Sequence, residues 1–228
     1  MAPRLKAGAV APAAALASAP HWGRAKRVLA AGDQTMARII AGHPRGRLVS
    51  RGDGFTTLAR SIVGQQISVK AADAVWGRLV QSCPQVSAQA ILRRRQATLR
   101  ACGLSERKVE YLRDLARHFH EGRVRMDELE RLSDEQVIEC LTDIHGIGRW
   151  TAEMFLIFNL LRPDVFPIDD LGLLKAIGRH YFEGEAPAGL LRGSGREKVV
   201  RLGAAWAPYR SVATWYLWRS LDPVPVEY

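Results

Sequence analysis

Residues 143–152 read DIHGIGRWTA, and this stretch decides the fold. Its glycines, Gly146 and Gly148, allow positive φ and close backbone approach, and an apolar helix is predicted to follow from about Arg149 to Leu161. The start of such a helix carries unpaired N–H groups and the positive end of the helix dipole, which together bind anions. With a helix before it, the stretch predicts a helix–hairpin–helix element that holds DNA phosphate without reading sequence. An ordinary helix–turn–helix with a glycine-rich turn remains the alternative on spacing alone.

The sequence on both sides of the hairpin has helical periodicity almost throughout, which predicts an all-α fold. Ser133 and Gln136 form a capping box for a helix that ends near Thr142, and Pro163 stops the helix after the hairpin. The other expected helices are two over residues 55–81 with a break at 64–66, one over 87–95, one over 105–120, one from about 170, one behind a second capping box of Ser194 and Glu197, and one over 209–220.

The composition is that of a globular protein with a basic bias. The 228 residues are 47% hydrophobic and 25% charged, enough for one or two compact domains. The net charge is +10, and residues 1–50, with eight basic side chains and one acidic, contribute +7 of it. Charge alone therefore does not choose between a nucleic-acid partner and a solvated surface. Residues 1–20, rich in alanine and proline, are predicted to form a disordered tail, which leaves residues 21–228 as the helical domain.

Compartment and metal chemistry are limited by what the sequence lacks. No apolar run approaches the roughly 18 residues that suggest a membrane span. Cys83, Cys102 and Cys140 lie far apart and form no CxxC pair, so they predict neither a zinc site nor a disulfide framework. This pattern suits a reducing compartment. We expect a cytoplasmic, nucleoid-associated protein that is a monomer.

Three separated motifs resemble the helix–hairpin–helix DNA glycosylase superfamily, in particular the 3-methyladenine DNA glycosylase II family. In chain order they are FTTLAR at 55–60 with GQQIS at 64–68, GIGRWTA at 146–152, and WAPYRS at 206–211 with Trp218. The resemblance covers roughly residues 50 to 220. It implies a two-lobed helical fold with a DNA cleft between the lobes and the hairpin at 143–150.

Two adjacent carboxylates, Asp169 and Asp170, precede a predicted helix. From the residues alone, one caps the helix and the other complements its dipole. The resemblance implies that Asp170 is the catalytic residue, with Asp169 as a cap or supporting residue. A fixed carboxylate beside the anomeric carbon stabilises the positive charge that develops when a base leaves, and it can orient or deprotonate the attacking water.

The resemblance also implies an aromatic pocket for the flipped base, formed by Trp150, Trp218 and Met154. A large π-face favours an electron-poor, cationic base by about 1–2 kcal/mol when the site is desolvated. From the residues alone, a core aromatic remains the alternative for Trp150. Relatives that also cut the strand carry a Schiff-base lysine at the position of Trp150, so no lyase activity is expected here.

The residues expected to contact DNA lie in two loops. Gln66 matches the family's wedge position, which fills the gap left by the flipped base, although a polar turn between helices explains it equally well. The full set expected to bind DNA is Gln65, Gln66, Gly146, Gly148 and Arg149. The family's hairpin also holds a monovalent cation, Na⁺ or K⁺, through backbone carbonyls, which here would belong to Thr142, Ile144 and Ile147. No cysteine lies beyond Cys140, so no iron–sulfur cluster is expected, and no cofactor is required.

The resemblance as a whole implies a monofunctional DNA glycosylase. The expected enzyme flips alkylated purines, such as 3-methyladenine and 7-methylguanine, out of damaged double-stranded DNA and hydrolyses the N-glycosidic bond with Asp170. Two alternatives stay open: a glycosylase for uracil or an oxidised base, and a non-catalytic helix–hairpin–helix DNA-binding protein. The second would keep Gly146 and Gly148 but has no need for Asp170 and both tryptophans.

Overall fold

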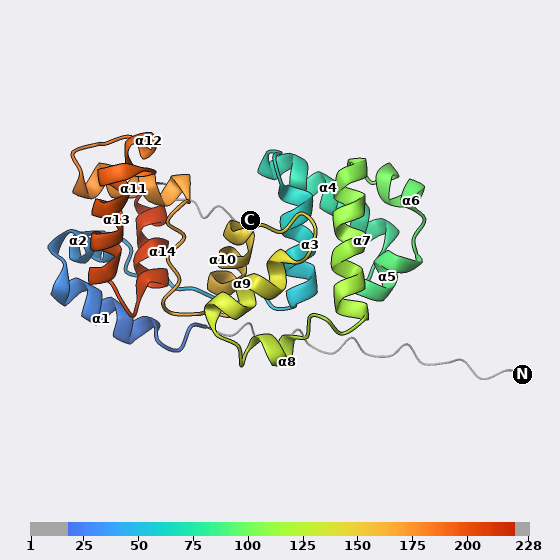
Figure 1. Ribbon diagram of the computed structural model, residues 1–228, viewed down its shortest axis with the longest axis horizontal. Helices are drawn as coiled ribbons and strands as arrows, with labels where there is room; N and C mark the ends of the chain where they lie inside the picture. Colours follow the sequence, from blue (N-terminus) through green and yellow to red (C-terminus); the bar gives the residue numbers. More distant parts are fainter. Residues whose placement is uncertain (1–17, 222–228) are drawn as a thin grey trace, which may run out of the picture.

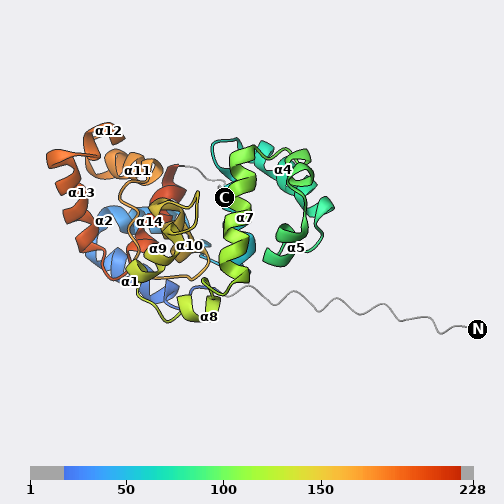
Figure 2. The same cartoon turned by 45° about the vertical axis from the view of Figure 1, so that its right-hand side comes forward.

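The structure is a computed structural model that describes residues 18–221, and its regular elements over that range are α-helices (Figure 1). The helices form two lobes. Helices α3–α7 form the first lobe, and α1, α2 and α11–α14 form the second, with α9 and α10 between them (Figure 1). The two groups stay apart when the molecule is turned by 45° (Figure 2). The predicted all-α, two-lobed fold is therefore confirmed.

The first lobe is built around the amphipathic helix α7 (Glu106–His120), which contacts α3, α5 and α6. Its buried side chains include Val109, Leu112 and Leu115, spaced three residues apart, as expected for one apolar helix face. The other helices of this lobe are α3 (Gly54–Gly64), α4 (Val69–Ser82), α5 (Ala88–Arg93) and α6 (Gln96–Ala101). The predicted break at 64–66 is confirmed, since α3 ends at Gly64 and α4 begins behind its cap, Ser68.

The second lobe joins the two ends of the described chain. Helix α14 (Arg210–Leu221) packs against α1 (Trp22–Gly32), α2 (Gln34–Gly42) and α11 (Leu171–Tyr181), and it is buried continuously over residues 211–217. Helices α12 (Pro187–Leu190) and α13 (Gly193–Ala205) complete the lobe. The sequence reading assigned no helices to residues 21–50, so α1 and α2 are additions from the structure.

Helices α8 (Met126–Leu129), α9 (Asp134–Thr142) and α10 (Arg149–Phe158) carry the chain between the lobes. The predicted capping box of Ser133 and Gln136 is present at α9. Helix α10 ends three residues before the predicted Leu161. The Ser50 hydroxyl donates to the Asn159 carbonyl at 3.0 Å, and the Arg51 N–H donates to the Phe158 carbonyl at 3.0 Å, so the segment between the lobes takes the carbonyls at the helix end.

The predicted capping box of Ser194 and Glu197 is wrong. Helix α13 begins at Gly193, before Ser194, with Arg192 at its N-cap, and no described side chain caps it. The start of the predicted domain is also fixed more closely by the structure. Ala19 is buried and its N–H donates to the Leu48 carbonyl at 3.0 Å, so the chain already packs against the domain there. Residues 1–17 of the predicted tail lie outside the described residues.

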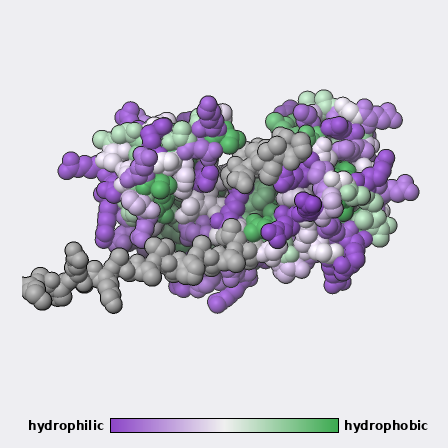
Figure 3. Space-filling view, turned by 180° about the vertical axis from the view of Figure 1, so that it is seen from behind, coloured by the Kyte–Doolittle hydropathy of each residue, from purple (hydrophilic) through white to green (hydrophobic). Residues whose placement is uncertain are grey.

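The surface seen from behind is mostly hydrophilic over both lobes (Figure 3). Apolar side chains gather there near the waist between the lobes (Figure 3). Over residues 18–221, none of the helices has the length and apolar character needed to cross a membrane.

Candidate active site

Asp170 lies between the lobes at the start of α11 and is held by three N–H donors. Its Oδ1 atom accepts from the Leu173 backbone N–H at 2.6 Å and from Trp218 Nε1 at 2.8 Å. Its Oδ2 atom accepts from Trp150 Nε1 at 2.8 Å. The carboxylate is half-buried. Helix capping and the tryptophan contacts thus fix both oxygens of one side chain.

Asp170, and not Asp169, is the N-cap of α11. Asp169 is exposed, and its Oδ1 atom pairs with Arg196 Nη1 of α13 at 2.6 Å. The interpretation of Asp169 as the helix cap is therefore wrong, because the capping geometry selects the residue directly before the helix. The two neighbouring carboxylates have different surroundings, and only Asp170 contacts the two tryptophans.

The two tryptophans come from different parts of the fold, Trp150 from the first turn of α10 between the lobes and Trp218 from α14 of the second lobe. Trp150 is 40% exposed, whereas Trp218 is half-buried. The close approach of Trp218 depends on Gly172. A Cβ at Gly172 would lie 3.2 Å from Asp170 Oδ1 and 3.4 Å from Trp218 Cδ1. The structure thus brings together three of the predicted site residues.

Two further residues, Phe158 and Arg51, add to this side of the site, and neither was predicted from the sequence. The rings of Trp150, Trp218 and Phe158 are together called the aromatic wall. Phe158 at the end of α10 stacks on Trp218 with ring centroids 5.8 Å apart, and the Arg51 guanidinium lies 4.5 Å from the Phe158 centroid. Phe158 thus covers one face of Trp218. Phe158 follows Trp150 by eight residues, about two helical turns, and this spacing was the available signal. Arg51 left no pattern in the sequence.

Met154 of α10 and Leu171 of α11 lie on the two helices that carry Trp150 and Asp170. Met154, a predicted pocket residue one turn beyond Trp150, is buried in the core with 8% exposure, and its role in the pocket stays a prediction. Leu171, the first residue of α11, is 61% exposed. A large apolar side chain beside Asp170 that faces solvent is available for contact with a bound molecule.

The hairpin between α9 and α10 uses its two glycines differently. Gly146 has φ of +86°, and a Cβ there would collide with the Tyr111 ring of α7. Gly148 is the N-cap of α10 with φ of −95°, and a Cβ there would meet no described atom within 4 Å. The expectation of positive φ therefore holds for Gly146 and fails for Gly148. The space in front of Gly148 lies at the amide end of α10, the end at which helices in general attract anions.

The hairpin is tied to the first lobe by two polar contacts. The His145 N–H donates to Asp114 Oδ2 at 2.9 Å, and Gln65 Nε2 donates to the Gly146 carbonyl at 2.7 Å. Burial alone would raise the pKa of Asp114, but hydrogen bonds from His145 and Arg117 outweigh it and lower this pKa. Gln65, predicted to bind DNA, thus joins its own loop to the hairpin.

Gln66 lies at the tip of the same loop. It is exposed, and its φ of +57° is unusual for a residue other than glycine. Ile67 beside it is 40% exposed. The loop therefore presents one polar and one apolar side chain next to the hairpin, and the wedge role of Gln66 stays a prediction.

Arg149, also predicted to bind DNA, is engaged by two glutamates. Its guanidinium pairs with both oxygens of Glu135 on α9, at 2.6 and 3.0 Å, and its Nε donates to Glu153 Oε1 at 3.1 Å. Glu153 is buried, with 6% exposure. Burial raises the pKa of Glu153 to about 7, against the opposing effect of Arg149. Three of the five guanidinium N–H groups of Arg149 are therefore engaged by carboxylates in the structure.

The predicted cation ligands all lie in or beside the hairpin. Thr142 is the last residue of α9, and the Ile144 carbonyl accepts from the Ile147 N–H at 3.0 Å. Over residues 18–221, no group of three or more His, Cys, Asp or Glu side chains is placed to hold a metal ion. The cation site stays a prediction.

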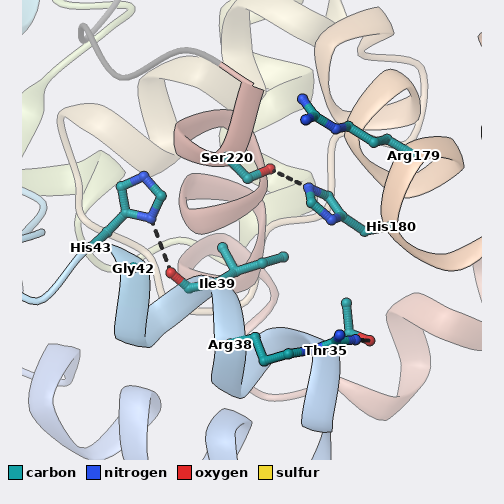
Figure 4. A pocket seen from close by; sticks show the side chains of 8 residues that line it. All are labelled: Thr35, Arg38, Ile39, Gly42, His43, Arg179, His180 and Ser220. Carbon is teal, nitrogen blue, oxygen red and sulfur yellow. Dashed lines mark hydrogen bonds between the residues drawn. The ribbon is translucent and has the colours of Figure 1, made fainter.

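A separate cavity of about 490 Å³ opens between α2, α11 and α14 (Figure 4). Its lining residues are Thr35, Arg38, Ile39, Gly42, His43, Arg179, His180 and Ser220. His180 Nε2 lies 2.8 Å from the Ser220 hydroxyl (Figure 4), and burial together with Arg179 and Arg38 lowers the pKa of His180. Arg179 and His180 lie in the last turn of α11, where positive charge complements the helix dipole. This role in the fold accounts for the two basic residues that α11 contributes to the cavity.

Fold and site together define a class of protein: a two-lobed helical protein in which a helix–hairpin–helix element lies beside a carboxylate held by two tryptophans. The chain belongs to the HhH-GPD superfamily of base excision DNA repair proteins, whose model matches residues 59–192, more than half of the chain. The resemblance found in the sequence is thereby confirmed.

Relatives and solved structures agree with this assignment. DNA-3-methyladenine glycosylase 1 of Schizosaccharomyces pombe is 33% identical over 189 residues, which are 81% of this chain and 80% of the relative. The crystal structure of a DNA-3-methyladenine glycosidase from Bacillus halodurans matches with a TM-score of 0.75 and 38% identity, over 86% of this chain and 88% of the other. The 3-methyladenine DNA glycosylase Mag1 of Schizosaccharomyces pombe, in complex with abasic DNA, matches with a TM-score of 0.72 and 31% identity, over 90% and 98%.

Proposed function

We propose that this protein is a monofunctional DNA glycosylase of base excision repair that removes alkylated purines, such as 3-methyladenine and 7-methylguanine, from duplex DNA. The observation that carries the proposal is the Asp170 carboxylate, held by Trp150 of α10 and Trp218 of α14. The relatives named 3-methyladenine glycosylases support the substrate class. The relative bound to abasic DNA supports DNA as the partner.

The chemistry assigned to Asp170 requires a fixed anion. When the base leaves, the sugar becomes oxocarbenium-like, and a carboxylate beside the anomeric carbon stabilises that charge without having to reorient. The N–H donors of Leu173, Trp150 and Trp218 supply this fixed orientation. The carboxylate also orients or deprotonates the attacking water. An alkylated purine that is already cationic needs little protonation to leave.

The aromatic wall favours a cationic base. Because Phe158 covers one face of Trp218, a base that stacks on Trp218 meets its other face, and the exposed ring of Trp150 offers a second surface for stacking. Stacking of a desolvated cation on tryptophan contributes about 2 kcal/mol. This preference favours alkylated purines over uracil or an oxidised base. A glycosylase for these neutral bases is the second candidate.

The hairpin and the loop that contains Gln66 are assigned to DNA binding. Gly148 and the first turn of α10 offer backbone amides to a phosphate, and Gln66 fills the space of the flipped base. The carbonyls of Thr142, Ile144 and Ile147 are hard oxygen donors near the negative end of α9, which suits an alkali cation. A crystal soaked in a heavy monovalent ion that shows no peak at these carbonyls would contradict the cation site.

The decisive experiment compares two adjacent carboxylates. Asp170→Asn keeps a helix cap but loses the anion, so we expect release of 3-methyladenine from methylated duplex DNA to slow by at least about a hundredfold while DNA binding persists. Asp169→Asn, which removes the pair with Arg196, is the matched control and should retain most activity. Released bases are identified by mass.

The same reaction separates the remaining alternatives. Because Trp150 supplies no amine, the strand should stay intact until hot alkali is added. Full activity in Asp170→Asn would show that another group performs the chemistry. If the wild type binds lesion DNA but releases no base, the protein is a non-catalytic DNA-binding protein and not a glycosylase.

A further inference from the structure

Glu153 is a buried carboxylate that the proposed reaction does not use. Its side chain is 8% exposed, and it faces Arg149 one turn earlier on α10 at 3.1 Å. From α9, Glu135 pairs with the same guanidinium, and Asp169, before α11, faces Glu153 while paired with Arg196 of α13. Arg149 thus supplies the positive charge beside Glu153, whereas Glu135 and Asp169 add negative charge.

Arg149 lies where the proposed phosphate arrives. It is the first residue of α10, directly after Gly148, and its side chain is 54% exposed. Its partner Glu135 is 65% exposed, and an ion pair between exposed side chains contributes little to stability. A phosphate can accept the same two parallel N–H bonds from the guanidinium. Exchange of Glu135 for phosphate is therefore favourable, and a guanidinium that moves away with the phosphate also withdraws its Nε from the buried Glu153.

We propose that Arg149 changes partners when the hairpin binds DNA, moving from Glu135 and Glu153 to a backbone phosphate, and that Glu153 takes up one proton from solvent as it loses this cation. The inference rests on the proposed function, since it requires the hairpin to bind DNA. A buried carboxylate without a partner is strongly unfavourable, and protonation removes its charge. Glu153 is then a positioning residue that acts through Arg149.

The direction of the pH dependence follows from these contacts. The pKa of Glu153 is about 7 with Arg149 beside it, and loss of Arg149, which lowers this pKa, raises it further. The complex therefore holds more protons than the free protein above about pH 7. Affinity for DNA falls as pH rises from there, by up to about tenfold per pH unit for one proton. Below the pKa of the free protein, Glu153 is protonated in both states and contributes no dependence.

Calorimetry counts this proton directly. A duplex that carries a tetrahydrofuran abasic analogue has no base to release, so the wild-type protein can be titrated at about pH 7.5 in buffers of different ionisation enthalpy. We expect net uptake of up to one proton per complex. Glu153→Gln mimics the protonated acid and should abolish this uptake. Its affinity should vary less than about twofold between about pH 7 and 8.5.

Three other variants make the result specific. Glu135→Gln removes the exposed partner of the same arginine and should leave proton uptake unchanged. His145→Asn measures the share of the exposed imidazole in the hairpin. Arg149→Gln removes the cation from the free protein, so Glu153 is already protonated and uptake should be lost. This variant serves the test if Glu153→Gln fails to fold.

The outcomes are distinguishable. Wild-type binding without proton uptake, or equal uptake in the wild type, Glu153→Gln and Arg149→Gln, overturns the inference and leaves the proposed function intact. Failure of the wild type to bind the duplex at all contradicts the proposed function instead. Loss of proton uptake in Glu135→Gln would show that the uptake depends on Glu135 and not on Glu153, and it would also overturn the inference.

Discussion

The missing side chain of Gly172 lets Asp170 and Trp218 meet. A Cβ at this position would lie 3.2 Å from Asp170 Oδ1, closer than most Cβ contacts, and in van der Waals contact with Trp218, 3.5 Å from its Nε1. We predict that Gly172→Ala slows base release by about tenfold or more, because the Trp218 hydrogen bond to a charged group contributes about 1.5–3 kcal/mol. Excision kinetics on methylated duplex DNA provide the measurement.

A glycine elsewhere in a helix provides the control for this variant. Gly77 lies in α4, and a Cβ there would meet no described atom within 4 Å. Gly77→Ala should therefore raise the free energy of unfolding by up to about 1 kcal/mol through helix propensity and leave excision unchanged. Equal activity in both alanine variants would show that the contact between Asp170 and Trp218 does not matter for the reaction.

The residues of the site differ in how far each could be predicted from the sequence. Asp170, Trp150 and Trp218 were found by their register in the motifs, and the structure brings them together. Phe158 and Arg51 were missed because their contacts join segments that are far apart in the chain. Glu153 was missed for a different reason: a single acidic residue within an apolar helix carries no signal for the ion pair that burial makes important.

Within the hairpin, the two glycines have different roles: we expect Gly146 to matter for folding and Gly148 to matter for DNA binding. Gly146 has positive φ and no room for a side chain beside Tyr111, so Gly146→Ala should lower the free energy of unfolding by about 1–3 kcal/mol. Gly148 has extended backbone and open space, so Gly148→Ala should cost about 1 kcal/mol or less as a poorer N-cap. Urea unfolding measures both variants.

The two variants should rank in the opposite order in how far they weaken DNA binding. A methyl group at Gly148 stands in front of the α10 amides, so Gly148→Ala should weaken binding of an abasic-analogue duplex by more than its small effect on stability explains. Gly146→Ala should bind with near-normal affinity once the folded fraction is taken into account. Unchanged affinity of Gly148→Ala for DNA would show that no phosphate binds at the start of α10.

The success of helix prediction also depended on the element. The helix starts at Ser87, Ser105 and Ser133 were predicted correctly for α5, α7 and α9, because each serine side chain bonds the backbone locally. The cap at Ser194 was wrong because α13 begins one residue earlier. The end of α10 was placed too late because its last carbonyls are taken by residues 50 and 51, a contact that periodicity does not report.

For the whole molecule, the sequence predicted the helical class and, through resemblance, the two lobes, but not how the chain divides between them. Helices α1 and α2 precede the first lobe in sequence and belong to the second, against α14. The placement of α1 and α2 in the second lobe depends on contacts between residues far apart in the chain, and local sequence patterns do not encode such contacts. Asp33, between α1 and α2, makes two of those contacts.

Asp33 provides an acid-sensitive link in the second lobe. Its Oδ2 atom accepts from the Tyr181 hydroxyl at 2.7 Å and from Trp206 Nε1 at 3.0 Å, and its Oδ1 atom caps α2. Burial alone would raise the pKa of Asp33, but the hydrogen bonds from Trp206, Met36 and Tyr181 outweigh it and lower this pKa. A lowered pKa in the folded state means that Asp33 stabilises the fold above its unfolded pKa of about 3.9. This stabilisation is lost as pH falls through the folded value.

We therefore predict that Asp33→Asn lowers the free energy of unfolding by about 1–3 kcal/mol at neutral pH, since asparagine still caps α2 but presents only one acceptor atom. The difference from the wild type should shrink as pH falls below about 4, because the wild type then loses the same charge. Asp53→Asn is the matched control: Asp53 caps α3 through the Thr56 N–H, a bond that asparagine can replace with little loss of stability. Urea unfolding at neutral and acid pH measures all three proteins. A difference between the wild type and Asp33→Asn that does not change with pH would show that the strength of these hydrogen bonds does not depend on the Asp33 charge.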